Sequence, residues 1–260
     1  MPTRDDLQVL EELKISFHRD IPSGQKIALS AINKALASHR GNPIWVKQHF
    51  SELIESVQID AYNLYLSAEK PAWKSAVVKV FGPLLRNCSS TEKITTVFSE
   101  HFYALDKFFL GLTNGRRARA GSAFEILLRE LFTLLKYPFN PHPKIDGNPD
   151  FVLPSVKHYM ENPLDSIIFT AKRSLRERWR QITSEGERGT AFFLATIDEN
   201  VTTKDLLVMQ AKRIFLVVPA RIKENIDRYE QAPAVITFED FFLNHLDPAM
   251  ERWKRSKKVR

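Results

Sequence analysis

Residues 149–185 read PDFVLPSVKHYMENPLDSIIFTAKRSLRERWRQITSE, and this stretch decides how the 260-residue chain folds. A short apolar run, Phe151–Leu153, follows Asp150, and a longer one, Ile167–Ala171, ends at Lys172. Short apolar runs flanked by proline and polar residues predict buried strands. We therefore expect two strands joined by a hairpin-like span, with a carboxylate on one strand and an amine at the end of the next.

Asp150 and Lys172 together point to phosphodiester hydrolysis. That reaction needs an activated water and a stabilised leaving oxygen. Mg²⁺ held by carboxylates supplies both, and a lysine near the water orients or deprotonates it. A common nuclease arrangement also has an acid two residues before the lysine, where this chain has Thr170. A hydroxyl does not bind metal as a carboxylate does, so another residue must supply the second acid.

Two glutamates are candidates for that second acid. Glu185 lies 13 residues after Lys172, and a helix over Leu175–Glu185 would place it on a face that looks back at the strand. Glu125 is a candidate for an additional ligand or for a residue that supports one. Each residue also has a purely structural interpretation: a turn cap for Asp150, a solvated strand end for Lys172, a surface residue for Glu185 and a capping acid for Glu125.

A charged string directly after the lysine suggests that DNA bases are read nearby. Arg176, Glu177 and Arg178 follow Lys172 within six residues. In the major groove of DNA, arginine pairs with guanine and glutamate accepts from cytosine, so this string can read adjacent G·C pairs. The alternative is a helix start that carries a local mixture of Arg–Glu ion pairs.

Outward from this stretch, the chain alternates strands and helices. Further strands are expected at residues 191–197, 213–219 and 234–238, and helices at Thr203–Ala211 and residues 221–228. Such alternation predicts an α/β fold with a central mixed sheet of about five strands flanked by helices.

The first part of the chain lacks strand-like alternation and predicts helices. Apolar residues recur at helical spacing over residues 27–36, 45–57, 72–85 and 93–112, with breaks at Pro22–Gly24, Gly41–Pro43 and Pro71. We therefore expect a helical N-terminal subdomain at residues 1–112 and a catalytic core at residues 113–260, packed as one compact unit. The subdomain is a candidate for DNA contacts, dimerisation or base flipping.

Residues 114–121, NGRRARAG, form a basic stretch of small residues that predicts a loop. The loop leads into an amphipathic helix from Ser122 to Phe132, for which Ser122 is the expected N-cap and Glu125 completes a capping box. Because backbone N–H groups at a helix N-terminus bind anions, Arg117 and Arg119 are candidates for contacts with the DNA backbone.

The amino-acid composition narrows the classes of possible binding partner. The net charge of +7 favours a polyanion, with nucleic acid ahead of a membrane surface. Cys88 is the single cysteine, which excludes an internal disulfide and a cysteine-rich zinc site and predicts a reduced, cytoplasmic setting. The N-terminus lacks the apolar region of a signal peptide, and no apolar run is long enough to span a membrane.

In the segments that carry Asp150, Lys172 and the Arg-Glu-Arg string, the chain resembles a known family. It resembles the Type II restriction endonucleases that recognise CCGG-containing sites, the EcoRII, PspGI and SsoII group of the PD-(D/E)xK superfamily. The similarity covers about residues 115–190 and is carried by Pro149–Phe151, by residues 171–182 (AKRSLRERWRQI) and by Glu185, with the upstream basic segment and Phe124-Glu125.

The resemblance implies a restriction-endonuclease-like core in which the second acid has moved to the helix after the lysine strand. Asp150 and Glu185 would bind Mg²⁺, Lys172 would be catalytic, and Arg176, Glu177 and Arg178 would contact CC:GG half-sites. The family cuts on the 5′ side of its site, leaves 5′ overhangs and usually acts as a homodimer. A companion DNA methyltransferase in the same bacterium or archaeon is also expected.

Some members of the group flip the central base pair and hold each base between an aromatic ring and an arginine. Arg40 with Trp45, or Trp73 with its lysine neighbours, are candidates for such a sandwich, although both tryptophans can equally be packing residues. Two other functions remain open: a nuclease of the same fold for repair or junction resolution, and a DNA-binding protein without catalysis.

Overall fold

The computed structural model describes residues 3–145, 147–175 and 192–258, with no account of the side chains after residue 255. The chain divides into two compact units. The helical unit comprises Met1–Ala31 and Ile59–Ala123, and the sheet unit comprises Ile32–Gln58 and Phe124–Arg260. The assignment of a helical subdomain to residues 1–112 and of a catalytic core to residues 113–260 stays a prediction.

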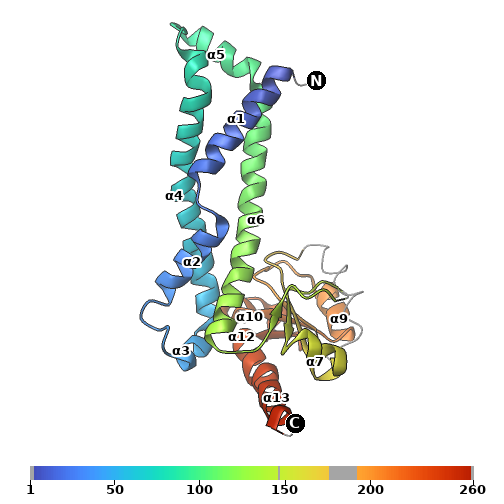
Figure 1. The fold of residues 1–260 in the computed structure, drawn as a ribbon. Coiled ribbons are helices and arrows are strands. Elements are labelled where there is room, and N and C mark those ends of the chain that lie inside the picture. The colour runs from blue at the N-terminus through green and yellow to red at the C-terminus, as the bar shows by residue number, and fades with distance from the viewer. Residues whose placement is uncertain (1–2, 146, 176–191, 259–260) are drawn as a thin grey trace. The chain divides into compact units, whose positions relative to one another are not determined.

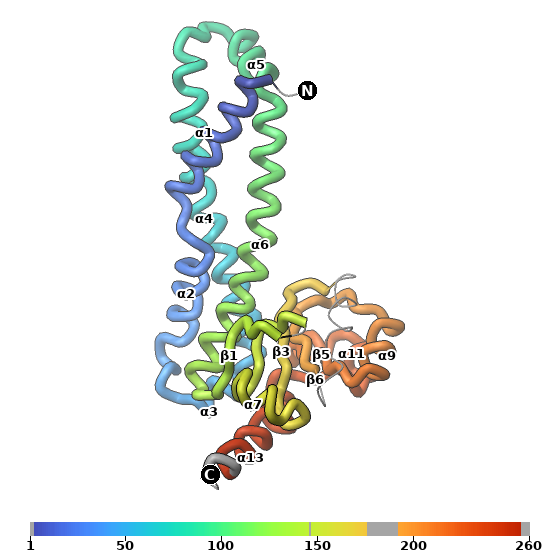
Figure 2. Tube along the Cα trace, turned by 45° about the vertical axis from the view of Figure 1, so that its right-hand side comes forward, coloured from blue at the N-terminus to red at the C-terminus, as the bar shows by residue number. Residues whose placement is uncertain are grey.

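The sheet unit is built on six strands in the order β1-β2-β3-β4-β5-β6. The first three strands are antiparallel and the last four are parallel, so the mixed sheet that the sequence predicts is confirmed. Figure 2 follows the chain through these strands as its colour passes from green to orange. The bounds are β1 Asn140–Pro141, β2 Phe151–Leu153, β3 Ile167–Ala171, β4 Phe192–Ala195, β5 Ile214–Val218 and β6 Val235–Thr237.

The strand sequences explain why both faces of the central strands β2–β5 are largely buried. Strand pairing aligns Phe151, Phe169, Phe193 and Phe215 into one aromatic row across four strands. Because side chains alternate between faces, the neighbouring row of Val152, Ile168, Phe192 and Ile214 faces the other way. Strands covered on both sides are continuously apolar, as these are.

Helices of the sheet unit cover these two rows. The aromatic row packs against Phe132 of α6 and Phe241 of α12, with ring centroids 5.4 Å apart for Phe132–Phe169 and 4.8 Å for Phe193–Phe241. The second row, which begins with Val152, joins a buried cluster that includes Leu206, Met209 and Tyr229. The helices are α3 Pro43–Gln48, α7 Val156–Glu161, α9 Thr203–Ala211, α10 Ala220–Glu224, α11 Asp227–Glu230, α12 Phe238–Phe241 and α13 Asp247–Lys258, with a 3-10 turn at Pro163–Asp165 and a π-helical turn at Phe242–Leu246.

The helical part of the chain contains α1 Arg4–Asp20, α2 Gly24–Ala35, α4 Phe50–Leu85, α5 Thr91–Glu100 and α6 Phe102–Leu134 (Figure 1). The division between the two units falls inside α2, α4 and α6. The break predicted at Pro71 is wrong, because α4 continues through Pro71 and Pro83. Buried Ala72, Ala76 and Val80 anchor the helix beyond the first proline, so packing outweighs the lost backbone hydrogen bond.

The loop predicted at residues 114–121 is also wrong. These residues are helical within α6, so Ser122 is not an N-cap and forms no capping box with Glu125. Two arginines of the stretch bind side chains of α4: Arg116 pairs with Glu69, and Arg119 donates to the hydroxyl of Tyr65. These contacts and the good helix propensity of arginine and alanine outweigh the low helix propensity of the two glycines.

The end of α6 turns the chain toward the sheet. Lys136 has a φ of 60°, and the Tyr137 N–H donates to the carbonyl of Phe132 at 3.0 Å. This hydrogen bond is typical of a helix that ends at a residue with left-handed backbone, and it turns the chain into β1. Among the described residues, no helix combines the length and apolar character required to cross a membrane.

Candidate active site

Asp150 lies one residue before β2 and is directed at β3. Its carboxylate Oδ2 accepts from the backbone N–H of Ala171 at 2.7 Å, and the residue is only 6% exposed. The β2–β3 register, Phe151 opposite Phe169, places Asp150 opposite Thr170. The side-chain hydrogen bonds of Asp150 therefore reach across the strands instead of capping its own turn.

Lys172 follows the last residue of β3 at the edge where the parallel strands end. Its backbone N–H donates to the carbonyl of Ala195, which continues the pairing with β4 at 2.9 Å. Its Nζ lies 3.0 Å from Oδ2 and 3.3 Å from Oδ1 of Asp150. The lysine side chain is 40% exposed. The structure thus brings the two residues together, with the amine open to a substrate.

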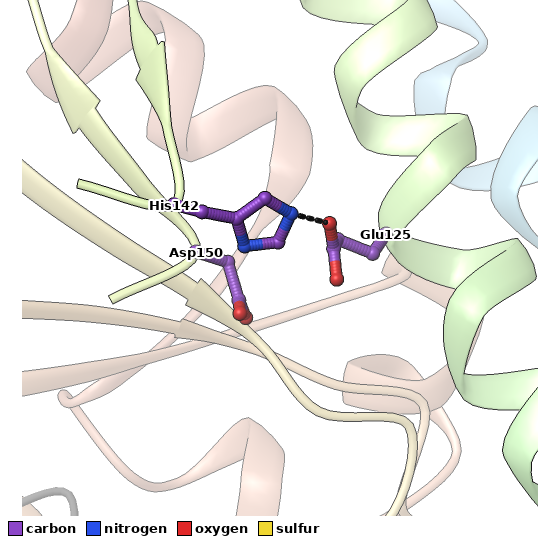
Figure 3. Close-up of side chains that lie close together, drawn as sticks. All are labelled: Glu125, His142 and Asp150. Atoms are coloured by element: carbon purple, nitrogen blue, oxygen red, sulfur yellow. Dashed lines mark ion pairs between the residues drawn. The ribbon is translucent and has the colours of Figure 1, made fainter. Parts of the chain in front are cut away.

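Glu125 and His142 complete the cluster around Asp150. Glu125 is on the part of α6 whose neighbours Phe124 and Leu128 are fully buried, and its side chain is 25% exposed. Nε2 of His142 lies 2.9 Å from Oε1 of Glu125. One donor atom from each of Glu125, His142 and Asp150 lies within 4.8 Å of the others. In Figure 3 the imidazole lies between the two carboxylates.

His142 is held in place by the sheet. Its backbone N–H donates to the carbonyl of Asp150 at 2.9 Å, which extends the β1–β2 pairing by one residue. Its φ is 44°, a left-handed conformation that is uncommon for residues other than glycine. Because its backbone is fixed to Asp150, the ring has a defined position next to both acids.

The two carboxylates of the cluster repel each other. Burial is the main cause that raises the pKa of Glu125 above its usual value, and repulsion from Asp150 adds to it. The charges of His142, Lys172 and Arg129 oppose this rise. Because the two carboxylates lie this close together, a further cation between them would relieve their repulsion.

The donor set fits a divalent cation. Carboxylate oxygens are the ligands that Mg²⁺ and Ca²⁺ prefer, and imidazole nitrogen extends the choice to transition metals. Thr170 is 2% exposed, and its hydroxyl oxygen is buried without a hydrogen-bond partner in the described part of the chain. Two of the acids that the sequence analysis selected, Asp150 and Glu125, thus lie in one cluster with His142, and Lys172 contacts Asp150.

A carboxylate in the loop after β4, that of Asp198, anchors the chain after Lys172. Oδ2 of Asp198 accepts from the Leu175 N–H at 2.8 Å and from the Ser174 hydroxyl at 3.2 Å, and Oδ1 accepts from the Asn200 N–H at 3.0 Å. Burial acts to raise the pKa of Asp198, but these hydrogen bonds outweigh it and hold the pKa below its usual value. Asp198 therefore fixes the direction in which the chain leaves β3.

Several predicted residues lie outside the described part of the chain. These are Glu185, the predicted second metal ligand, and Arg176, Glu177 and Arg178, the predicted base-reading residues. Their roles stay predictions.

Arg117 and Arg119, the predicted backbone contacts, are on α6 instead of in a loop. Arg117 is exposed. Arg119 donates to the Tyr65 hydroxyl at 3.2 Å, and its guanidinium lies 4.8 Å from the centre of that ring. Both side chains can still meet a phosphate, and for Arg119 the orientation is set by Tyr65.

The predicted stacking residues have aromatic neighbours within their own units. Trp45 lies between His39 and His49, with ring centroids 3.6 and 4.3 Å away. Trp73 contacts Phe108 and Phe109 at 5.5 and 5.0 Å. Because Trp45 carries an imidazole on each face, a base can stack on it only after one histidine moves. Arg40 is exposed and donates to Asn33 at 2.9 Å.

The sequence interpretation missed His142 and Asp198. His142 lies in a proline-rich segment that has no apolar pattern, so neither the two-residue strand β1 nor the pairing with Asp150 left a sequence signal. Asp198 had a weak signal, an acid directly after the strand next to the one that carries Lys172.

Comparison with known proteins relates this chain to a family. The family model described as EcoRII C terminal matches residues 84–242. The Type II restriction enzyme SsoII of Shigella sonnei is 30% identical over 169 residues, which cover 60% of this chain and 52% of that protein. The Type II restriction enzyme EcoRII of Escherichia coli is 29% identical over 216 residues, 79% of this chain and 46% of that protein. The chain thus spans about half the length of these relatives.

Solved structures share the fold. Metal-depleted Ecl18kI in complex with uncleaved DNA superposes with a TM-score of 0.79 at 21% identity, covering 95% of this chain and 84% of that one. The restriction endonuclease PspGI in its substrate DNA complex gives a TM-score of 0.62 at 21% identity, covering 90% of this chain and 94% of that one. The restriction-endonuclease-like fold predicted from the sequence is confirmed.

Proposed function

The chain belongs to the EcoRII C-terminal family, and on that premise we propose that it is a Type II restriction endonuclease. Its substrate is double-stranded DNA with a short palindromic site containing CC/GG half-sites, of the CCGG, CCNGG or CCWGG type. It cuts both strands on the 5′ side of the site and leaves 5′ overhangs. The observation that supports this most strongly is the pairing of Lys172 with Asp150 at the sheet edge, next to Glu125.

The proposed metal ligands are Asp150 and Glu185, with Glu125 as an additional acid. When bound there, Mg²⁺ would stabilise negative charge on the phosphate and favour ionisation of the attacking water. The donor chemistry of Asp150 and Glu125 suits that ion, and the repulsion between the two carboxylates favours its binding.

Lys172 is the proposed catalytic residue. Asp150 holds its ammonium at 3.0 Å, and the side chain is 40% exposed, so the attacking water or the phosphate could reach the ammonium. The same carboxylate is fixed by the Ala171 N–H, so Lys172 and the metal-binding acid keep a constant spacing. Asp198 holds residues 174–175, which limits how far the chain after Lys172 can move.

Recognition is assigned to residues that come before and after the site residues in the sequence. Arg176, Glu177 and Arg178 are the proposed readers of the G·C pairs, only four to six residues beyond Lys172. Arg117 and Arg119 are the proposed contacts with the DNA backbone. If the central base pair is flipped, Trp45 with Arg40, or Trp73, is the proposed stacking partner, with residues 1–112 supplying DNA or dimer contacts.

A palindromic site requires two copies of one set of readers, so a homodimer is proposed. A DNA methyltransferase acting on the same site, in the cytoplasm of the same bacterium or archaeon, would protect the host genome.

The test is to incubate the purified protein with a plasmid of known sequence in Mg²⁺, and in parallel with EDTA. Discrete fragments in Mg²⁺ alone support the proposal. Random degradation would indicate a nuclease without site specificity, as expected for repair or junction resolution. Specific binding without cutting would indicate a DNA-binding protein that lacks catalysis.

A further inference from the structure

A histidine that the nuclease chemistry does not require lies within the metal-binding cluster. In Figure 3 its imidazole lies between the carboxylates of Glu125 and Asp150, with one ring nitrogen facing Glu125 and the other on the side of Asp150. Since its nitrogen and the two carboxylate oxygens lie within 4.8 Å of one another, all three can reach one ion after small side-chain movements.

We propose that His142 is a nitrogen ligand that adapts this site to a divalent first-row transition metal, in addition to Mg²⁺. The inference rests on the proposed function only for the location of the metal; it adds a ligand and a class of ion. Mg²⁺ and Ca²⁺ take oxygen ligands almost exclusively, whereas imidazole binds Co²⁺, Ni²⁺ and Zn²⁺ strongly.

The contacts of the three residues support a ligand role. The backbone N–H of His142 donates to the carbonyl of Asp150 at 2.9 Å, which keeps the Cα of His142 beside Asp150. Its Nε2 lies 2.9 Å from Glu125 Oε1, which is the separation of two atoms that share one proton. A transition metal would take the place of that proton between the same two atoms.

Exposure also supports this role. The side chain of His142 is 62% exposed, that of Glu125 25% and that of Asp150 9%. A hydrated ion arriving from solvent therefore meets the imidazole first and the most buried carboxylate last. Although Asp150 already accepts from Ala171 and Lys172, a carboxylate has about four acceptor positions and can still bind an ion.

The test titrates the full-length protein with Co²⁺ and, separately, with Ca²⁺, in the absence of DNA. Visible absorption reports Co²⁺ binding, and isothermal titration calorimetry reports both ions. His142→Ala is compared with wild type and with His158→Ala, whose histidine pairs with Asp165 and lies outside the cluster. Circular dichroism melting confirms that each variant is folded.

The expected result is that His142→Ala weakens Co²⁺ binding by about 10- to 100-fold, changes Ca²⁺ binding by less than about threefold, and removes a paramagnetically shifted imidazole proton signal of the Co²⁺ form. His158→Ala should match wild type. An equal loss for both ions would mean that His142 only orients Glu125. Unchanged Co²⁺ binding, or none in wild type, would likewise overturn the inference. Because no cleavage is measured, its failure is separate from that of the proposed function.

Discussion

Glu69 in the helical unit and Glu125 in the sheet unit are both partly or fully buried acids on long helices, but their surroundings differ. Glu69 is 7% exposed and accepts from Arg116 at three contacts of 2.6–3.0 Å and from Tyr65 at 3.1 Å. Glu125 has an imidazole, a second carboxylate and a more distant lysine around it, and its pKa is raised. Removing an acid that is paired with a buried arginine destabilises the fold, whereas an acid whose pKa is raised by burial and by a second carboxylate is a candidate for binding a cation.

Lys172→Ala tests the functional side of this contrast and should have the largest effect. We expect the rate of plasmid cleavage in Mg²⁺ to fall by roughly 10²- to 10⁴-fold, the range for losing a group that handles the proton of the attacking water. Specific DNA binding in Ca²⁺, measured by gel shift, should stay near the wild-type level. Lys204→Ala, on the exposed face of α9, is the control. Lost binding would make Lys172 a structural residue instead.

Glu69→Ala tests the structural side. Removing the acid leaves Arg116 without its partner, and breaking a buried pair costs about 3–5 kcal/mol. Because the arginine side chain is 38% exposed, we expect the free energy of unfolding to fall by about 2–3 kcal/mol in urea denaturation. Glu11→Ala removes an exposed pair with Lys14 and should change it by less than about 1 kcal/mol. If both variants lose the same free energy of unfolding, the burial of Glu69 does not make its ion pair more important for stability.

Asp198→Ala sharpens the comparison, because this acid is satisfied by backbone and hydroxyl donors instead of by a cation. Losing its hydrogen bonds with Ser174, Leu175 and Asn200 should lower the free energy of unfolding by about 1.5–3 kcal/mol. Cleavage by the folded fraction should also slow, by about tenfold, since the chain after Lys172 loosens. Asp198→Asn should recover part of both losses. Normal cleavage in the alanine variant would rule out a positioning role.

Glu125→Gln should have the smallest effect and the opposite sign. A raised pKa means that the folded protein favours the protonated acid, so the stability from protonation is present below the usual pKa and is lost as pH rises through the folded value. In EDTA near pH 7, the glutamine variant should therefore be more stable than wild type by roughly 0.5–1 kcal/mol. The difference should vanish below about pH 4 in urea denaturation. A less stable variant at pH 7 would show that Glu125 is satisfied as an anion.

The sequence predicted the sheet unit better than the helical one, for a physical reason. Strands buried on both faces, such as Ile167–Ala171, are continuous apolar runs with clear ends, so five of the six strands were located. Strand β1 has only Asn140 and Pro141, and its pairing depends on β2. The glycines and arginines of residues 114–121 looked like a loop because Glu69 and Tyr65, which hold the helix, lie about 50 residues away in sequence.

The same contrast holds within the site. Asp150 and Lys172 could be predicted because each lies at the end of a strand, and neighbouring strand ends meet. Glu125 was predicted as an additional acid of the metal site, with a capping role as the alternative; the structure contradicts the capping role and places Glu125 beside Asp150. His142 depends on one hydrogen bond to the Asp150 carbonyl and on a left-handed backbone, neither of which the sequence displays.

The most direct test of the proposed function is run-off sequencing of plasmid fragments produced by the protein in Mg²⁺. The proposal predicts ends that all fall at one short palindrome with CC/GG half-sites, staggered to leave 5′ overhangs, and no products in EDTA. Fragment ends that share no sequence, or a plasmid that stays intact while the protein binds it specifically, would contradict the assignment of site-specific endonuclease activity to the cluster of Asp150, Lys172 and Glu125.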